Sequence, residues 1–159
     1  MLGLLDLQTQ IREDNLLPFY IFTGEEIELQ NIYLKQMGNV VRIDSVADVY
    51  NKITSKLISS KFTIYVVRDD MDFIKSEKTW SNISNKIRNA VLVVQVTTTS
   101  KCKKFIKELN DCVVEFNHMT TKQLLNVVNM DCSVSNKQYF IEACNNDLNT
   151  INNYLDIFK

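Results

Sequence analysis

The sequence predicts a three-layer α/β protein with a mainly parallel five-stranded sheet, followed by a small subdomain of three helices. Five short runs rich in Val, Ile, Phe and Tyr alternate with segments of helical spacing, and only helical patterns follow the fifth run. Near-continuous apolar runs are typical of strands buried on both faces of a parallel sheet. Strands that alternate with helices favour a wound sheet covered on both faces. We therefore expect an α/β domain over 1–117 and a helical lid over 118–159.

The expected strands are short and enriched in β-branched and aromatic residues, which favour strands; they cover 18–23, 39–43, 62–67, 90–97 and 112–116. The segments between them show apolar residues at helical spacing, and the helices expected there cover 25–37, 45–59, 79–88 and 100–109. Gly38 follows the first of these helices as a C-cap, and Ser45 precedes the second as an N-cap.

The lid is expected from three successive amphipathic segments, TTKQLLNVVNM, SNKQYFIEAC and NDLNTINNYLDIF. Thr120, Ser135 and Asn146 are the residues expected to cap these helices. A unit of about forty residues is too small to be stable by itself.

Composition excludes several classes of function. A formal net charge of -1 gives no overall field toward nucleic acid or an anionic membrane, so any DNA contact would be local or made through partners. Cys102, Cys112, Cys132 and Cys144 include no C-x-x-C pair, which indicates buried or half-buried thiols in a reducing compartment rather than a metal site. The first residues, MLGLLDLQTQIRED, lack the features of a signal peptide, and no apolar run reaches the length of a membrane span. We expect a soluble cytoplasmic protein.

The turn after the first strand is where an α/β protein would hold a nucleotide. A phosphate loop needs several backbone N–H groups, a lysine and a Ser or Thr for magnesium, whereas here Gly24 is followed by Glu25 and Glu26. We expect Gly24 to make the strand-to-helix turn and the two carboxylates to complement the helix N-terminus. Neither a nucleotide cofactor nor enzyme activity is expected.

Asp69 and Asp70 follow the third strand, at the edge of the sheet where α/β sites gather. They are compatible with a Walker B pair, or with the acidic site of a response-regulator receiver, for which Thr97 also fits. The expected role is simpler, a solvated turn that caps the next segment. His118 is expected at the surface and Trp80 in the core, and the lysine-rich segment 100–109 should present a solvated face rather than a phosphate-contact patch.

Four segments together resemble one family: PFYIFTGEE, KLISSKFTIYVVRDD, TTTSKCKKFIKELNDCVVEFNHMT and ACNNDLNTINNYLDIF. In this order they are similar to the delta subunit of the bacterial DNA polymerase III clamp loader, across nearly the whole chain. The resemblance implies an AAA+-like, P-loop NTPase-like fold whose Walker A loop is replaced by a Gly-acid-acid turn. Asn149 stands where an active relative has its sensor arginine. The family also has a further C-terminal collar domain, which these residues do not include.

The resemblance implies a contact with the sliding clamp through the end of the helix before the third strand. The positions that match are Leu57 and Ile58, with Ser55 before them and Lys61 able to reach the rim of the clamp. In the helix expected over 45–59, Leu57 lies in line with the buried stripe and Ile58 lies about 100° away from it. Leu57 is therefore either a core residue or a contact residue.

The expected function is that of a non-catalytic, clamp-loader delta-like protein that binds the DNA polymerase sliding clamp, and the sequence leaves open whether it also opens the clamp. Other clamp-loader subunits are further expected partners, with DNA met only indirectly and no membrane involved. One alternative is a competitor or inhibitor that binds the clamp without loading it. The others are a degenerate P-loop NTPase and the receiver-like switch.

Overall fold

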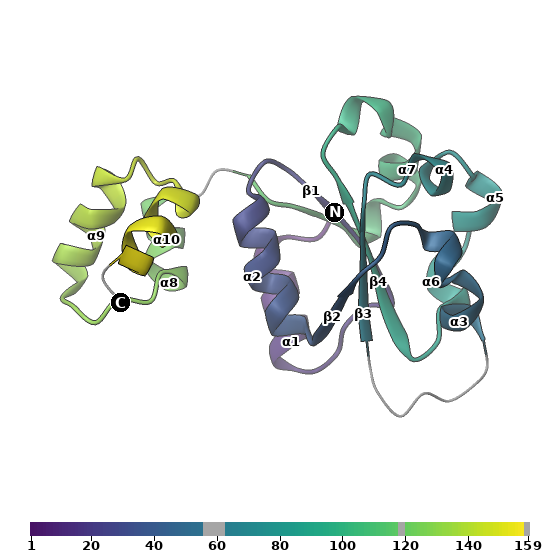
Figure 1. Cartoon of the computed structure of the whole chain (residues 1–159), viewed down its shortest axis with the longest axis horizontal. Coiled ribbons are helices and arrows are strands. Elements are labelled where there is room, and N and C mark those ends of the chain that lie inside the picture. Colours follow the sequence, from purple (N-terminus) through teal and green to yellow (C-terminus); the bar gives the residue numbers. More distant parts are fainter. Residues whose placement is uncertain (56–62, 118–119, 158–159) are drawn as a thin grey trace.

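The computed structural model describes residues 1–55, 63–117 and 120–157. Its centre is a five-stranded sheet in which every neighbouring pair is parallel, with the strand order β2-β3-β4-β1-β5. The strands are β1 (Phe19–Thr23), β2 (Asn39–Arg42), β3 (Thr63–Arg68), β4 (Ala90–Val96) and β5 (Val113–Glu115). All five predicted strands are present within one or two residues of their expected bounds. The predicted three-layer α/β fold with a parallel sheet is thus confirmed (Figure 1).

Burial on both faces, expected for every strand, holds at the centre of the sheet but not at one edge. All residues of β1 and β4 are buried, whereas β2 has an exposed or half-exposed pattern throughout, and Val41 is 38% exposed. β2 pairs with β3 alone. An edge strand has a neighbour on one side only, which is why its apolar residues are less covered.

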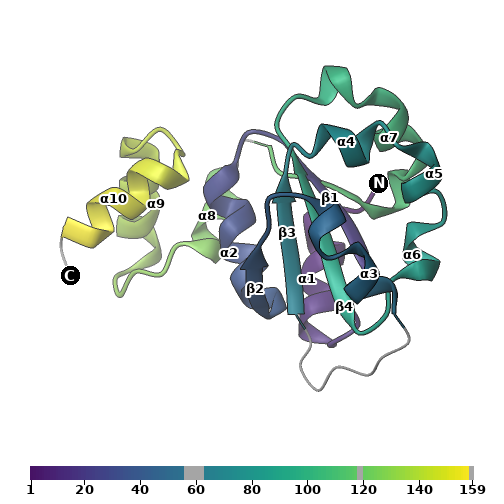
Figure 2. The ribbon, with the colours of Figure 1, turned by 45° about the vertical axis from the view of Figure 1, so that its right-hand side comes forward.

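One face of the sheet is covered by α1 (Leu4–Arg12) and α2 (Ile27–Met37), as Figures 1 and 2 show. The prediction for α2 is confirmed, with Gly38 as its C-cap. α1 was not predicted. It is tied to the core by polar side chains: Gln8 Nε2 donates to the Tyr33 hydroxyl at 2.8 Å, and the Tyr20 hydroxyl donates to Gln10 Oε1 at 2.6 Å.

The other face carries short helices that pack on a second apolar cluster, which includes Phe19, Phe73, Trp80 and Phe105. These elements are η1 (Val46–Asp48), α3 (Tyr50–Thr54), α4 (Met71–Ile74), α5 (Glu77–Trp80), α6 (Ile83–Lys86), η2 (Thr99–Lys101), α7 (Lys103–Glu108) and η3 (Asn110–Cys112). Trp80 is buried as expected, and its indole N–H donates to the Ile74 carbonyl at 2.9 Å.

Three of the predicted helices on this face are broken. The segment predicted as a helix over 45–59 contains a 3₁₀ turn and then the short helix α3, which ends at Thr54 because Ser55 has extended backbone angles (φ -72°, ψ 149°). In the segment 79–88, Asn82 adopts the left-handed conformation (φ 59°) between α5 and α6. The segment 100–109 is likewise divided between η2 and α7.

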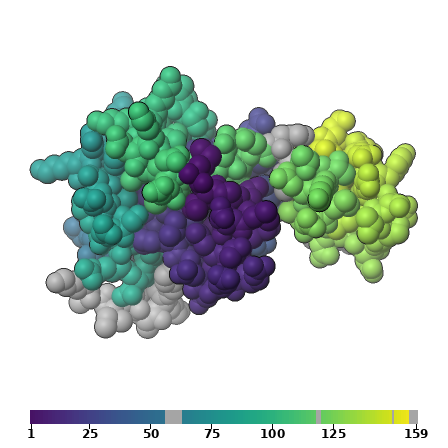
Figure 3. Space-filling model, turned by 180° about the vertical axis from the view of Figure 1, so that it is seen from behind, coloured from purple at the N-terminus to yellow at the C-terminus, as the bar shows by residue number. Residues whose placement is uncertain are grey.

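The lid consists of α8 (Thr121–Val127), α9 (Val134–Ala143) and α10 (Leu148–Ile157) and forms a separate lobe beside the α/β domain (Figure 3). Leu124, Ile141 and Ile151 are buried in the same apolar cluster as the α2 face of the sheet. A groove of about 820 Å³ between Glu28 and Ile32 of α2 and the lid helices marks where the two parts meet. The lid therefore depends on α2 for part of its apolar cover.

Of the three residues predicted to cap the N-termini of the lid helices, one is correct. Thr120 caps α8 in a reciprocal pair with Gln123. At α9 the cap is Ser133, whose hydroxyl accepts from Asn136 N–H at 3.3 Å, and the predicted Ser135 lies inside the helix. Asn146 is not the cap of α10: it has φ 57° and donates its N–H to Ile141, so it belongs to the end of α9.

The thiols are mostly buried. Cys102, Cys112 and Cys144 are buried, and burial raises the pKa of each thiol, whereas Cys132 is exposed, contrary to expectation. Within the described residues, no helix has the length and apolar character needed to span a membrane. His118 lies outside the part of the chain that the structure describes.

We expect Tyr20→Phe to reduce the loss of stability at alkaline pH. Burial raises the pKa of Tyr20 to about 12 from an ordinary 10.0, partly offset by the hydrogen bond from Leu17 N–H. The unfolded chain therefore loses this proton first, and the free energy of unfolding falls as pH rises from 10 toward 12. Urea unfolding from about pH 8 to about pH 12 measures this slope.

The control is Tyr139→Phe, since Tyr139 is 77% exposed. At neutral pH Tyr20→Phe should cost about 1 kcal/mol, because Leu17 N–H and Gln10 lose their shared partner. Tyr33, whose pKa burial also raises, contributes to the slope in every variant. Equal alkaline slopes in the wild type and Tyr20→Phe would contradict the prediction.

Candidate partner-binding site

The turn between β1 and α2 is closed by the chain itself. Gly24 has φ 101°, and a Cβ at this position would lie 2.2 Å from the carbonyl oxygen of Phe116. Phe116 follows β5, and its N–H donates to Thr23 at 2.8 Å while its carbonyl accepts from Glu26 N–H at 3.1 Å. The expectation that Gly24 makes the strand-to-helix turn is confirmed. In addition, the approach of Phe116 requires glycine.

This closure changes what the turn can do chemically. In a phosphate loop the backbone N–H groups point at the ligand, whereas here Glu26 N–H already has an acceptor within the chain. Glu25 is exposed beside it, and Glu26 occupies the N-cap position of α2. The carboxylates of Glu25 and Glu26 place negative charge at this corner. This charge would repel the negatively charged phosphates of a nucleotide.

A buried polar network lies under the same turn. Gln95 of β4 is fully buried and donates to Gln30 of α2 at 2.8 Å, and Gln30 is oriented toward the carbonyls of Thr23 and Gly24 at 3.4–3.5 Å. Arg42 of β2 donates to Gln95 Oε1 at 3.3 Å. These bonds connect three strands and α2, and none of the described buried side-chain N or O atoms lacks a partner.

The sequence analysis missed this network. A single polar residue inside the apolar run AVLVVQV was the available signal for Gln95. Gln30 stands between apolar positions of an amphipathic helix, where a glutamine is ordinarily exposed. Only the fold shows that these two side chains face one another across the layer between α2 and the sheet.

The acidic pair after β3 has two separate structural roles. Asp70 caps α4, accepting from Phe73 N–H at 3.3 Å, and also accepts from Val46 N–H at 2.8 Å, so its expected capping role is confirmed. Asp69 has φ 51° and accepts both from Thr97 N–H at 2.9 Å and from the Thr97 hydroxyl. The two carboxylates thus tie the ends of neighbouring loops together.

The receiver alternative is wrong. Receiver domains have the strand order 2-1-3-4-5, whereas here β1 lies between β4 and β5. Asp69 is consequently two strands away from the acidic turn after β1 and cannot share a pocket with Glu25 and Glu26 in the way that a receiver requires. Among the described residues, no group of three or more His, Cys, Asp and Glu side chains is arranged to hold a metal ion.

Of the predicted contact residues, the structure describes Ser55; Leu57, Ile58 and Lys61 lie outside the described residues. Ser55 is half-exposed and follows directly on α3. Since the helix ends at Thr54, the helical geometry used to relate Leu57 and Ile58 to the buried stripe does not apply across Ser55. The base of the segment is held firmly: Arg88 N–H donates to the Ile53 carbonyl at 2.7 Å, and Ile53 is 1% exposed.

The lysine-rich segment is exposed, as expected. The side chains of Lys101, Lys103, Lys104 and Lys107 all reach solvent. Lys104 forms an ion pair with Glu77 of α5, and this pair raises the pKa of the lysine. An exposed pair of this kind contributes little to stability.

Comparison with known proteins identifies a related fold. The Bacillus subtilis DNA clamp loader delta protein (YqeN) matches this chain with a TM-score of 0.66 and 14% sequence identity, over 92% of this chain and 54% of that one. This chain therefore spans about half the length of that neighbour. No protein-family model and no curated protein matches the sequence. At this identity the likeness shows a clamp-loader-like fold and nothing finer.

We expect Gly24→Ala to destabilise the protein by about 3 kcal/mol, because the substitution combines a strained φ with an overlap on a backbone carbonyl. The matched control is Gly3→Ala, where the nearest heavy atom to the new Cβ would be Asp6 Oδ2 at 3.5 Å. The control should change the free energy of unfolding by less than about 1 kcal/mol. Urea unfolding measures both, and similar values for the two variants would show that Phe116 does not constrain the turn.

The glutamine network gives a second prediction. Gln95→Leu should destabilise the protein by about 2 kcal/mol, because the Gln30 amide loses its closest partner in a buried site. The double variant Gln30→Leu/Gln95→Leu should recover part of this loss, since no unpaired glutamine remains. A double-mutant cycle by urea unfolding measures the coupling, and additive losses would show that the two amides act independently.

Proposed function

We propose that this protein is a non-catalytic, clamp-loader delta-like protein that binds a DNA polymerase sliding clamp. The observation that supports this most is the closed β1–α2 turn on a clamp-loader-like fold: the corner that would hold a nucleotide is occupied by the Phe116 carbonyl and flanked by Glu25. A protein of this fold without phosphate recognition would act through protein contacts. Such a protein would work in the cytoplasm, with other clamp-loader subunits as further partners and DNA met only through them.

The proposed contact is the segment that begins at Ser55. In the family that the sequence resembles, apolar residues at the end of the helix before the third strand contact the clamp, and Leu57 and Ile58 match these positions here. An apolar pair that fills a pocket of a partner provides most of the binding energy in many interfaces. Lys61 would contact the polar rim, where a charge affects the rate of association more than the affinity.

The test is binding to a purified bacterial sliding clamp, by surface plasmon resonance or sedimentation. We expect Leu57→Ala/Ile58→Ala to weaken binding by at least about 2 kcal/mol, or about 30-fold, while the far-UV circular dichroism is unchanged. The matched control is Leu5→Ala/Val134→Ala, which removes two apolar side chains that are 76% and 68% exposed elsewhere on the surface. This control should bind like the wild type.

Each other outcome has a distinct meaning. If the wild-type protein does not bind the clamp, the proposed function is wrong. If it binds and the Leu57/Ile58 variant binds equally well, the contact lies elsewhere. If that variant unfolds, the pair belongs to the core.

Two alternatives are separated by further measurements. A competitor that binds without loading would bind the clamp as the proposed protein does, but it would not increase the opening of a clamp labelled with a fluorescent pair across its subunit interface. A degenerate P-loop NTPase would bind labelled ATP, and binding at the Gly24 turn would contradict the proposal directly.

A further inference from the structure

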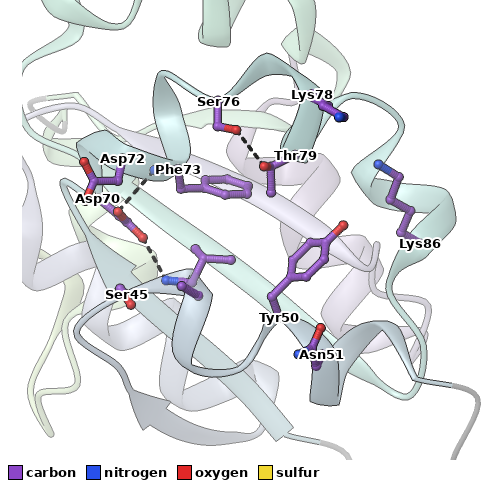
Figure 4. Close-up of a pocket in the computed structure, with 12 residues that line it drawn as sticks. Ser45, Tyr50, Asn51, Asp70, Asp72, Phe73, Ser76, Lys78, Thr79 and Lys86 are labelled. Carbon is purple, nitrogen blue, oxygen red and sulfur yellow. Dashed lines mark hydrogen bonds between the residues drawn. The ribbon is translucent and has the colours of Figure 1, made fainter.

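A pocket of about 640 Å³ lies on the sheet face opposite α1 and α2, between the η1–α3 segment and the α4–α6 segment. Figure 4 shows the residues that line it, among them Val46, Tyr50, Phe73, Ser76, Lys78 and Lys86. Its volume is in the range of sites that take small molecules. It lies near the carboxyl ends of β2 and β3, where ligands of open α/β sheets commonly bind.

The walls of this pocket are fixed by internal contacts. Asp70 accepts from the backbone N–H groups of both Val46 and Phe73, which joins the two sides of the pocket at one end. Phe73 is 5% exposed and packs against Phe105 with ring centroids 5.9 Å apart. A cavity held in this way exists before any ligand binds, so little ordering is required on binding.

The surfaces inside the pocket combine an apolar body with one basic end. Val46 and Phe73 are apolar residues of the lining, and the rings of Phe73 and Tyr50 both lie in the pocket (Figure 4). Lys78 of α5 and Lys86 of α6 both line the pocket, and Figure 4 shows them at the end away from Asp70 and Asp72. Over the described residues, neither lysine has an ion-pair or hydrogen-bond partner, and the Tyr50 hydroxyl has none either.

Two carboxylates, those of Asp70 and Asp72, lie at the other end of the pocket. Both oxygens of Asp70 accept backbone N–H groups, from Val46 and from Phe73, so this carboxylate has its hydrogen-bond partners within the protein. Asp72 and Lys78 are both exposed to solvent, which screens the two charges alike, whereas Lys86 is half-buried. The ammonium group of Lys86 is therefore the less screened of the two positive charges that a ligand would meet.

We propose that this pocket binds a small anionic molecule with an aromatic or apolar body. The body lies against Phe73, Val46 and Tyr50, and its carboxylate, sulfonate or phosphate group lies between Lys78 and Lys86. The Tyr50 hydroxyl and the Ser76–Thr79 hydroxyl pair, 2.6 Å apart, supply hydrogen bonds at the rim. This proposal is independent of clamp binding.

The test uses two probes with the same aromatic body, 1-anilinonaphthalene-8-sulfonate and the uncharged N-phenyl-1-naphthylamine. Trp80 provides a local readout, because it is the only tryptophan in the chain and directly follows Thr79, which lines the pocket. We expect the anionic probe to bind the folded protein saturably at one site, with energy transfer from Trp80. The uncharged probe should bind about tenfold more weakly.

The decisive comparison is between two double variants, each of which removes two positive charges: one pair in the pocket and one pair on α7. Lys78→Gln/Lys86→Gln should weaken binding of the anionic probe about tenfold and leave the uncharged probe unaffected. Lys103→Gln/Lys107→Gln removes two exposed lysines of α7 and should change neither. Because Lys86 is half-buried, Lys78→Gln alone, at an exposed side chain, should still weaken the anionic probe about threefold if the double variant does not fold.

Three results would overturn the proposal: no saturable binding of the anionic probe, equal losses in the two double variants, or equal affinity for both probes. Each would mean that the two lysines do not form an anion site beside an apolar wall.

Discussion

The contact between Gly24 and Phe116 is the constraint from which the rest of the arrangement follows. The carbonyl of Phe116 lies where a Cβ at Gly24 would be, and it accepts the N–H of Glu26 at the start of α2. One backbone group thereby fixes the end of β5, the direction of α2 and the point from which the chain leaves toward the lid. In a phosphate-binding loop, a backbone N–H at the start of a helix donates to phosphate. Here the Glu26 N–H donates to the Phe116 carbonyl instead, and this hydrogen bond stabilises the folded chain.

The position of α2 then controls the lid. Gln30 and Gln95 hold α2 to the sheet from below, and Arg42 extends the network to the edge strand. Because a partly satisfied buried network is costly, these side chains favour one placement of the helix. The lid packs on the outer side of α2. The orientation of the lid therefore depends on the hydrogen bonds of Gln30 and Gln95, which lie on the side of α2 that faces the sheet.

The sequence predicted the strands well and the second layer of helices less well, for a physical reason. The strands at the centre are buried on both faces, so their composition alone identifies them. The helices over Phe73 and Trp80 are single turns, whose extent is set by packing on the sheet and not by periodicity. α1 was not predicted, although Leu4, Leu7 and Ile11 stand at helical spacing and Leu7 is fully buried. Its polar anchors, Gln8 and Gln10, bind tyrosines elsewhere in the chain, and the sequence does not reveal these partners. The glutamine network and the lining of the pocket were not predicted for the same reason: they bring together residues that are distant in sequence.

The position of α3 shows how a helix of five residues can be held in place at both ends. The segment that leads into α3 is fixed by the hydrogen bond from Val46 N–H to Asp70. The last turn of α3 is fixed by the hydrogen bond from Arg88 N–H to the Ile53 carbonyl. Both anchors belong to the layer that also carries α4–α6, so Ser55 leaves the helix from a defined point. For the contact proposed after Ser55, an anchored starting point would reduce the conformational entropy lost on binding.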